Sequence, residues 1–304
     1  MESIIFFFVA LLVAPFFSAI IMKVKAFFAG KQGPPLLIKY YTLVKLLQKG
    51  SVYSTSTTFV FKLGPIVTFA SAVMILLFFP FAGAAPVFSF HGDVIILFYL
   101  MGLGRFFTII AALDTASPFE GMGAAREAYF STLAEATIFV VLFLFFKING
   151  SLSFAEYFNG SEAINLFSAS GSLLLLVINA LFMVLLTENS RVPVDDPATH
   201  LELTMIHEVM ILDHGGPDLA LIEYGAYLKM FFYSAFITSL LMPFQLGNVY
   251  LNGLLFLAVL SLSYICVGVT ESIMARFKMN LVPKFILTSF ALVFFALILS
   301  MEFV

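Results

Sequence analysis

The residues with the greatest chemical potential are concentrated in one stretch, 188–224, ENSRVPVDDPATHLELTMIHEVMILDHGGPDLALIEY. It holds three of the four histidines and many of the acidic residues, whereas the sequence on either side is strongly apolar. Neutral imidazole accepts and donates protons near pH 7. The stretch therefore favours proton handling or the docking of a partner. The simpler alternative is an amphipathic helix whose polar face is solvated or pairs with a neighbour's basic patch.

The three histidines of this stretch, His200, His207 and His214, are spaced by seven residues. On one helix they would share a face but lie about 10.5 Å apart per step. Two of them could not bind one ion at about 2 Å, so we expect no metal site on this face. Gly215 and Gly216 are expected to end the helix, with His214 just past its end.

Further charged residues fall inside apolar runs, where ionisable groups are functional hypotheses by default. Arg105 lies nine residues before Asp114, and Glu135 lies nine residues after Arg126. If Asp114 and Arg126 mark the same membrane interface, the side chains of Arg105 and Glu135 both lie about 13 Å from it. Equal depth allows Arg105 and Glu135 to pair. The pair is either part of an ion route or a structural link between helices.

Two other side chains, Asn179 and Lys229, reach a similar depth by the same counting. The sequence therefore predicts a lateral polar layer of Arg105, Glu135, Asn179 and Lys229 across four helices. Ser131 is four residues before Glu135 and is expected to reach it on the same helix face.

Arg126 points about 180° away from Glu135 and is expected to face the connection 114–127. There, Pro118, Gly121 and Gly123 predict a shaped turn.

The elements that must position these groups are membrane helices. The chain is 62% hydrophobic and 11% charged, with a mean hydropathy of +1.07. This composition predicts an all-α polytopic membrane protein with one membrane domain, 1–304. Apolar runs long enough to cross about 30 Å of hydrocarbon predict eight spans. They lie near 4–22, 65–85, 93–113, 128–147, 172–187, 221–243, 251–270 and 284–302.

The orientation follows from the lysines and arginines, which gather in the connections on one side of these spans. The positive-inside rule places such connections in the cytoplasm. The predicted cytoplasmic segments are 23–64, 114–127, 188–220 and 271–283. Both termini then lie outside, large cytoplasmic loops follow the first and fifth spans, and the protein is a multi-pass protein of the cell membrane.

The first cytoplasmic segment contains a basic amphipathic helix, LLIKYYTLVKLLQK. Lys39, Lys45 and Lys49 share one sector of it. Such a helix either lies on anionic lipid headgroups or receives a cytoplasmic partner.

Several function classes are excluded by what the sequence lacks. The single cysteine, Cys266, cannot form an internal disulfide or hold an iron–sulfur cluster. There is no CxxC, P-loop or GxGxxG motif, and the histidines fall outside the predicted spans. We therefore expect neither a redox cofactor nor a nucleotide in this chain, and no nucleic-acid partner. Electrons, if any are involved, are carried by other subunits.

The chain resembles the membrane subunit of respiratory complex I that meets the peripheral arm. The resemblance rests on Gly123-Ala-Ala-Arg126, Glu135, Glu188-x-x-Arg191-x-Pro193-x-Asp195 and Glu202, and on the KQGPP and KLLQKG segments. The stretch DDPATHLELTMIHEVMILDHGGPDLALIEY is more similar to the hydrogenase branch of that family, found in hydrogenase-4, formate hydrogenlyase and energy-converting membrane-bound hydrogenases. Ala198 and His200 stand where complex I subunits tend to carry acids.

This resemblance implies a non-redox anchor beneath a [NiFe]-hydrogenase-like large subunit and an iron–sulfur small subunit, beside antiporter-like membrane subunits. The [NiFe] centre and the iron–sulfur clusters would belong to those partners, whose electron transfer the anchor would couple to proton or sodium movement. The resemblance implies that the entry to the charged route is formed by Glu135, Glu188, Arg191, Asp195 and Glu202. From composition and position we add Glu208, Asp213 and Glu223 to the route, together with Arg105, Arg126 and Lys229. The docking surface would include Lys39, Lys45, Lys49, His200 and His207.

Two alternatives remain. A quinone-chamber subunit of a complex I-like NADH:quinone oxidoreductase predicts a quinone pocket. A stand-alone secondary transporter predicts an internal inverted repeat, and the two halves of this sequence show none.

Overall fold

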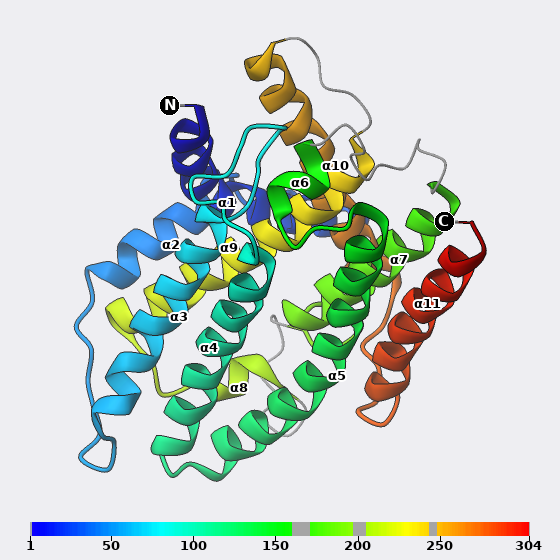
Figure 1. The fold of residues 1–304 in the computed structure, drawn as a ribbon. Coiled ribbons are helices and arrows are strands. Elements are labelled where there is room, and N and C mark those ends of the chain that lie inside the picture. Colours follow the sequence, from blue (N-terminus) through cyan, green and yellow to red (C-terminus); the bar gives the residue numbers. More distant parts are fainter. Residues whose placement is uncertain (1, 160–170, 197–204, 243–247, 304) are drawn as a thin grey trace.

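The computed structural model describes residues 2–159, 171–196, 205–242 and 248–303, and the regular structure of these residues is helical, as predicted. The helices are α1 (Glu2–Phe28), α2 (Ile38–Leu47), α3 (Phe59–Leu77), α4 (Asp93–Asp114), α5 (Pro118–Asn149), α6 (Phe154–Asn159), α7 (Gly171–Glu188), α8 (His207–Met210), α9 (Gly216–Leu241), α10 (Val249–Ile273) and α11 (Val282–Phe303). Figure 1 shows α3, α4 and α5 side by side, with α7 and α11 next to α5.

Six helices are long and apolar enough to cross a membrane by length and composition: α1, α3, α4, α5, α10 and α11. They establish a multi-pass membrane protein. The other two predicted spans coincide with α7 and α9. The apolar part of α7 is short, Leu173–Glu188, and α9 carries Asp218, Glu223 and Lys229. A total of eight spans therefore stays a prediction.

Helix α9 lies at the centre of the bundle. It packs against α1, α2, α3, α7 and α10, and in Figure 1 it runs obliquely behind α3 and α4. Its Phe232 and Phe236 are buried against Phe79 and Phe154, with ring centroids 5.4 to 5.7 Å apart. Because other helices surround α9, its charged residues face protein rather than lipid, which is where membrane proteins tolerate them.

Helices α3 and α4 approach each other closely through small residues. A side chain at Gly64 would place its Cβ 2.8 Å from the Cβ of Ala111, and Gly104 similarly faces Ser71. Small residues are the usual means by which membrane helices come this close. This contact positions α4, which carries Arg105.

The connections predicted to share the cytoplasmic side do lie together at one end of the bundle. Ser51 donates to the carbonyl of Gly215 at 3.2 Å, and the hydroxyl of Tyr53 donates to Asp218 at 2.7 Å. The N–H of Thr58 donates to Asp114 at 2.6 Å. The first connection is thus tied to the second and to the start of α9.

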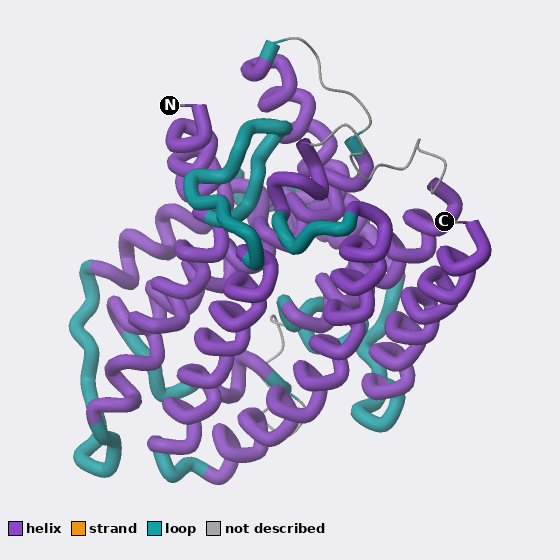
Figure 2. Tube along the Cα trace, viewed as in Figure 1, coloured by secondary structure: helices purple, strands orange, loops and turns teal. Residues whose placement is uncertain are grey.

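Two further contacts complete this end of the molecule. The N–H of Asp213 donates to Glu120 at 3.1 Å, and that of Phe277 donates to the carbonyl of Pro193 at 2.8 Å. Figure 2 shows the loops 115–117 and 274–281 at the lower edge of the bundle, and the loop 48–58 running down its left side to that edge. The grouping agrees with the predicted sidedness, while the side of the membrane on which it lies remains a prediction.

Two local expectations were wrong. Helix α5 already begins at Pro118, so Gly121 and Gly123 are helical and form no turn. Proline suits the first helical position because its missing N–H would have no partner there. Gly215 and Gly216 end no helix, because Gly215 is the N-cap residue of α9 and Gly216 begins it.

The histidines therefore share no long helix face. His207 begins the four-residue helix α8, and His214 lies beyond its end. His200 falls in 197–204, outside the described residues.

Candidate functional site

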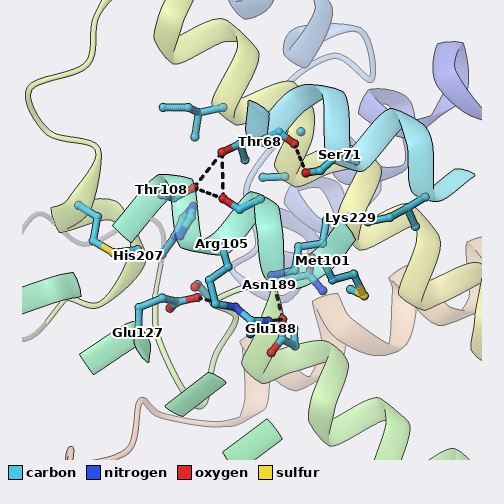
Figure 3. A pocket seen from close by; sticks show the side chains of 18 residues that line it. Thr68, Ser71, Met101, Arg105, Thr108, Glu127, Glu188, Asn189, His207 and Lys229 are labelled. Carbon is cyan, nitrogen blue, oxygen red and sulfur yellow. Dashed lines mark hydrogen bonds and ion pairs between the residues drawn. The ribbon is translucent and has the colours of Figure 1, made fainter. Parts of the chain in front are cut away.

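Arg105, in the middle of α4, is the centre of a buried charged cluster. Its guanidinium contacts Glu135 through Nη1 and Glu188 through Nη2, the latter at 2.6 Å. Its Nε lies 3.9 Å from Oε1 of Glu127. The arginine side chain is only 9% exposed, so these interactions are weakly screened by solvent. Figure 3 shows Arg105, Glu127 and Glu188 converging on one another.

Glu188 links this arginine to α9. Its Oε2 also lies 2.9 Å from Nζ of Lys229, and its side chain is fully buried. Glu188 is the last residue of α7, where the helix dipole disfavours a negative charge. Two cations therefore hold a carboxylate at a helix end that would otherwise repel it. We call Arg105, Glu127, Glu135, Glu188 and Lys229 the Arg105 cluster.

Residues of the cluster line cavities within the bundle. A cavity with about 690 Å³ of empty space is lined by Arg105, Glu127, Glu188 and Lys229, and also by His207 of α8. Its opposite wall carries the hydroxyl groups of Thr68 and Thr108, which hydrogen bond at 2.9 Å (Figure 3).

Two smaller cavities extend from the same residues. Glu127 and Glu188 border one of about 250 Å³, and Arg105 and Glu135 border one of about 440 Å³. Residues of the cluster thus border three cavities.

The predicted polar layer is only partly present. Arg105, Glu135 and Lys229 meet in one cluster, but Asn179 is exposed and donates to the carbonyl of Leu175 at 2.8 Å on its own helix. Glu188, at the end of α7, takes the place predicted for Asn179. Ser131 likewise donates to the carbonyl of Glu127 at 2.5 Å rather than to Glu135.

A second group of charges fixes the segment that follows α7. Asp195 is fully buried, pairs with Arg276 at 2.7 Å, and accepts hydrogen bonds from the N–H groups of Ile206 and His207 at 3.0 and 3.2 Å. Arg126 donates to the carbonyl of Met205 at 2.9 Å, so it faces this segment and not Glu135. These bonds hold His207 at the cavity.

A third group joins α10 to α1. The side chain of Glu271, which is 1% exposed, lies 3.0 Å from Lys25 and 3.4 Å from Arg191. Arg191 thus belongs to this group and contacts no acid of the Arg105 cluster among the described ion pairs.

A fourth group lies where α2 meets α9. The ammonium group of Lys39 lies 5.2 Å from the ring centroid of Tyr227, whose hydroxyl donates to Glu223 at 2.5 Å. Burial lowers the pKa of Lys39, which is turned toward α9, whereas Lys45 and Lys49 are exposed. Burial also raises the pKa of Glu208.

The remaining predicted residues stand apart from these groups. The side chain of Asp213 is exposed and makes no hydrogen bond among the described residues, although its backbone binds Glu120. Glu202 and His200 lie outside the described residues.

Glu127, Glu271, Lys25 and Arg276 were not predicted as site residues. All four flank apolar runs, and a charged residue at such a position ordinarily lies at the membrane–water interface rather than in a buried site. For Glu127, the one available signal was its position eight residues before Glu135, which keeps both on the same half of a helix.

Comparison with known proteins gives a consistent result. The sequence pattern of the NADH dehydrogenase family matches residues 1–301. Formate hydrogenlyase subunit 4 of Escherichia coli is 28% identical over 293 residues, which are 94% of each chain. Hydrogenase-4 component C of the same organism is 29% identical over 236 residues, covering 78% of this chain and 73% of that one.

More distant similarity extends to respiratory complexes. NADH-ubiquinone oxidoreductase chain 1 of Triticum aestivum is 26% identical over 225 residues, covering 72% of this chain and 67% of that one. A solved structure of a membrane-bound sulfane sulfur reductase, an archaeal respiratory membrane complex, contains a chain that superimposes with a TM-score of 0.84. It covers 98% of both chains at 18% identity and therefore shows the same fold.

Proposed function

Since this chain belongs to the NADH dehydrogenase family and forms a multi-pass membrane protein, we propose that it couples electron transfer in partner subunits to ion translocation. It would anchor a [NiFe]-hydrogenase-like large subunit and an iron–sulfur small subunit, which hold the metal centres. Antiporter-like membrane subunits would lie beside it. The translocated ion is a proton or sodium.

The observation that carries the proposal is the Arg105 cluster. It joins α4, α5, α7 and α9 through ion pairs, and it borders the cavity that His207 also lines. His207 is held by Asp195 in the segment that we assign to the docking side. His207 and the Arg105 cluster line one cavity, which would form the route from that side into the bundle.

The mechanism would be electrostatic. A change of charge at a docked partner alters the field at the segment 188–216, and buried groups respond strongly because screening among them is weak. This change in the field would alter the pairing of Arg105 with its three carboxylates. The altered pairing would in turn change how often an ion occupies the route.

The relatives support the hydrogenase branch of this proposal. Two of them are named as a formate hydrogenlyase subunit and a hydrogenase-4 component, and the first aligns over almost the whole chain. The test is to purify the native complex through this chain and to measure its nickel and iron content. Nickel and iron–sulfur proteins that copurify, with ion movement during turnover, support the proposal. A chain that purifies alone and moves ions without a redox substrate contradicts it.

A quinone-chamber function is the second candidate, because the plant relatives are named NADH-ubiquinone oxidoreductase chain 1. It predicts that a quinone-site inhibitor blocks electron transfer in the purified complex. Full activity in the absence of any quinone would exclude it.

A further inference from the structure

A large apolar cavity lies between α1 and α10 and shares no residue with the Arg105 cluster. It contains about 820 Å³ of empty space and is lined by residues of α1, α9, α10 and the connection that follows α3. Apart from the phenol group of Tyr250, every side chain in its lining is a hydrocarbon, and the one remaining position is Gly253. Apolar cavities of this kind stay dry and bind apolar molecules. The lining therefore favours a hydrocarbon ligand over water or an ion.

The cavity extends from the exposed surface of the two helices to the centre of the bundle. Two of its lining residues, Ile5 of α1 and Leu254 of α10, are 47% and 66% exposed. Two others, Ala10 of α1 and Phe231 of α9, are almost completely buried. A ligand that enters between α1 and α10 can therefore reach the central helix α9.

Helices α1 and α10 run parallel, and glycines bring them close together. A Cβ at Gly253 would lie 2.7 Å from the ring of Phe6, and one at Gly268 would lie 2.8 Å from the Cβ of Val24. The contacts follow the same order on both helices, so both helices begin at the same end of the molecule. Figure 1 shows the N-terminus and the start of α10 at the top, opposite the lower edge where the loops 115–117 and 274–281 lie. The cavity belongs to this upper half, because residues 5–10 and 250–257 line it.

The mouth of the cavity is continuous with a surface that faces lipid. Both α1 and α10 are long and apolar enough to cross a membrane. Beside the mouth, Phe8 and Leu12 of α1 and Leu251 of α10 are each more than half exposed. Lipid tails are as apolar as leucine and cover such surfaces in a bilayer. The hydrocarbon next to the cavity is therefore that of lipid acyl chains.

Tyr250 indicates the level of the lipid headgroup. It lies in the first turn of α10, where its N–H donates to the side chain of Asn248 at 3.0 Å, and its side chain is exposed. Tyrosines of membrane proteins are enriched at the level of the headgroups. Neither α1 nor α10 has a lysine or arginine in the half that lines the cavity, so these helices offer no cation to an anionic headgroup. The cavity thus selects a hydrocarbon tail rather than a headgroup charge.

We propose that this cavity binds an acyl chain of a membrane lipid, with the headgroup near Tyr250 and the tail directed toward Phe231. The bound chain supplies dispersion contacts that the side chains of α1, α9 and α10 do not make with one another across the cavity. It thereby becomes part of the packing between these three helices. The inference is independent of the proposed function, since binding requires neither electron transfer nor ion movement.

The test is photolabelling of the purified complex in nanodiscs that contain phosphatidylcholine with a diazirine in its acyl chain. Mass spectrometry of the peptides identifies the labelled residues. Labelling of 5–10 and 250–257 should saturate at a low fraction of the reactive lipid, as expected for a binding site. The exposed face of α11 around Phe294 and Ile298 should be labelled in proportion to that fraction. Proportional labelling of both regions would reduce the cavity to ordinary bilayer surface and overturn the proposal.

Filling the cavity provides the matched comparison. Ala10→Phe adds a ring at the buried end and should reduce cavity labelling several-fold, while labelling of α11 is retained. Val9→Phe, at a partly exposed lining position, should act in the same direction and serves if Ala10→Phe fails to assemble. Leu262→Phe changes an exposed residue of α10 outside the lining and should behave as wild type. Undiminished labelling in an assembled Ala10→Phe or Val9→Phe complex would contradict the proposal.

Competition distinguishes the acyl chain from other occupants. Excess unlabelled phosphatidylcholine should displace the label, whereas a quinone with an isoprenoid tail should leave it in place. Displacement by the quinone alone would assign the cavity to a quinone tail and overturn the proposal. A cavity that takes up no label because another subunit covers it would overturn the proposal as well.

Discussion

Glu188 illustrates how one buried carboxylate can hold three helices together. It ends α7 and contacts Arg105 of α4 and Lys229 of α9, and its side chain is fully shielded from solvent. A buried ion pair adds little net stability compared with an apolar replacement, but removal of one partner is damaging because the other charge stays buried. The cluster is therefore more sensitive to single substitutions than its net energy suggests.

Glu188→Gln is expected to destabilise the bundle by about 3 to 5 kcal/mol, because Arg105 and Lys229 lose their shared acid. Thermal unfolding in detergent measures the effect. The double variant Glu188→Gln/Lys229→Met should be more stable than the single variant, since it removes one of the stranded cations. A single variant as stable as wild type would show that Glu188 is not ionised.

His214 is a buried histidine outside the cluster. Its ring stacks on Phe61 with centroids 3.9 Å apart and an angle of 8° between the planes. Burial lowers the pKa of His214 to about 4, and the nearby Asp218 and Asp213 oppose this only in part. The folded protein thus holds the imidazole neutral.

This pKa predicts a loss of stability in acid. The folded pKa lies below the unfolded value of about 6.5, so the unfolded state binds more protons as the pH falls from 6.5 toward 4. Between pH 7 and pH 5 the loss from this group is about 2 kcal/mol. In His214→Phe the pH dependence of the melting temperature should shrink accordingly. An identical dependence in both proteins would mean that His214 titrates normally.

At the scale of elements, a proline in α1 creates a joint between three helices. Pro15 has no N–H, so the carbonyl of Leu11 lacks its helical donor. The hydroxyl of Tyr224 on α9 donates to that carbonyl at 2.9 Å, and the hydroxyl of Tyr40 on α2 donates to the carbonyl of Leu12. The break in α1 is thus bound by α2 and α9.

A double-mutant cycle tests this joint. Tyr224→Phe should cost about 1 kcal/mol in the wild-type background, because the carbonyl of Leu11 loses its partner. In the Pro15→Ala background the cost should be smaller, since the new backbone N–H can bond to that carbonyl. Chemical unfolding of the four proteins gives the coupling energy. Equal costs in both backgrounds would show that the tyrosine does not serve the proline break.

The sequence predicted the helices well but the side-chain groups only in part. Apolar runs located the eight long helices of the described residues, because hydrophobic length is a local property. Counting residues from the predicted membrane interface at Asp114 and Arg126 also placed Arg105 and Glu135 at the same depth, and the two side chains do form an ion pair. The same counting failed for Asn179, since it places a residue along a helix but says nothing of the direction in which the side chain points.

Burial of the helix ends could not be predicted from one sequence. Glu188 ends α7 and Glu271 lies in the last turn of α10, near which soluble segments were expected, yet neighbouring helices cover both. Glu127 was hidden for a similar reason, because it stands next to Arg126 and resembles an interfacial pair. Only the packing of α4 against α5 brings it within reach of Arg105.

At the scale of the whole molecule, charge divides between an interior cluster and an exposed basic helix. Lys45 and Lys49 on and after α2 are exposed, at the end of the bundle where the connections meet. Lys39 on the same helix is turned inward onto Tyr227. This arrangement leaves the two outer lysines to a partner or to anionic lipid.

Lys45→Gln/Lys49→Gln should weaken the retention of the peripheral subunits and make that retention less sensitive to salt. The reason is that salt weakens attraction between exposed charges, with a screening length of about 10 Å at 0.1 M salt. Copurification at increasing salt concentration measures this. Lys284→Gln, an exposed lysine on α11, should behave as wild type. Unchanged retention with weaker binding to anionic vesicles would assign the helix to the membrane surface instead.

The most direct test of the coupling function is the number of ions moved per electron in the Glu135→Gln complex, measured in vesicles beside wild type. Glu135 contacts Arg105 and borders the cavity of about 440 Å³. We predict a complex that assembles and transfers electrons but moves several-fold fewer ions. Full ion movement by an intact Glu135→Gln complex would contradict an ion route through the Arg105 cluster.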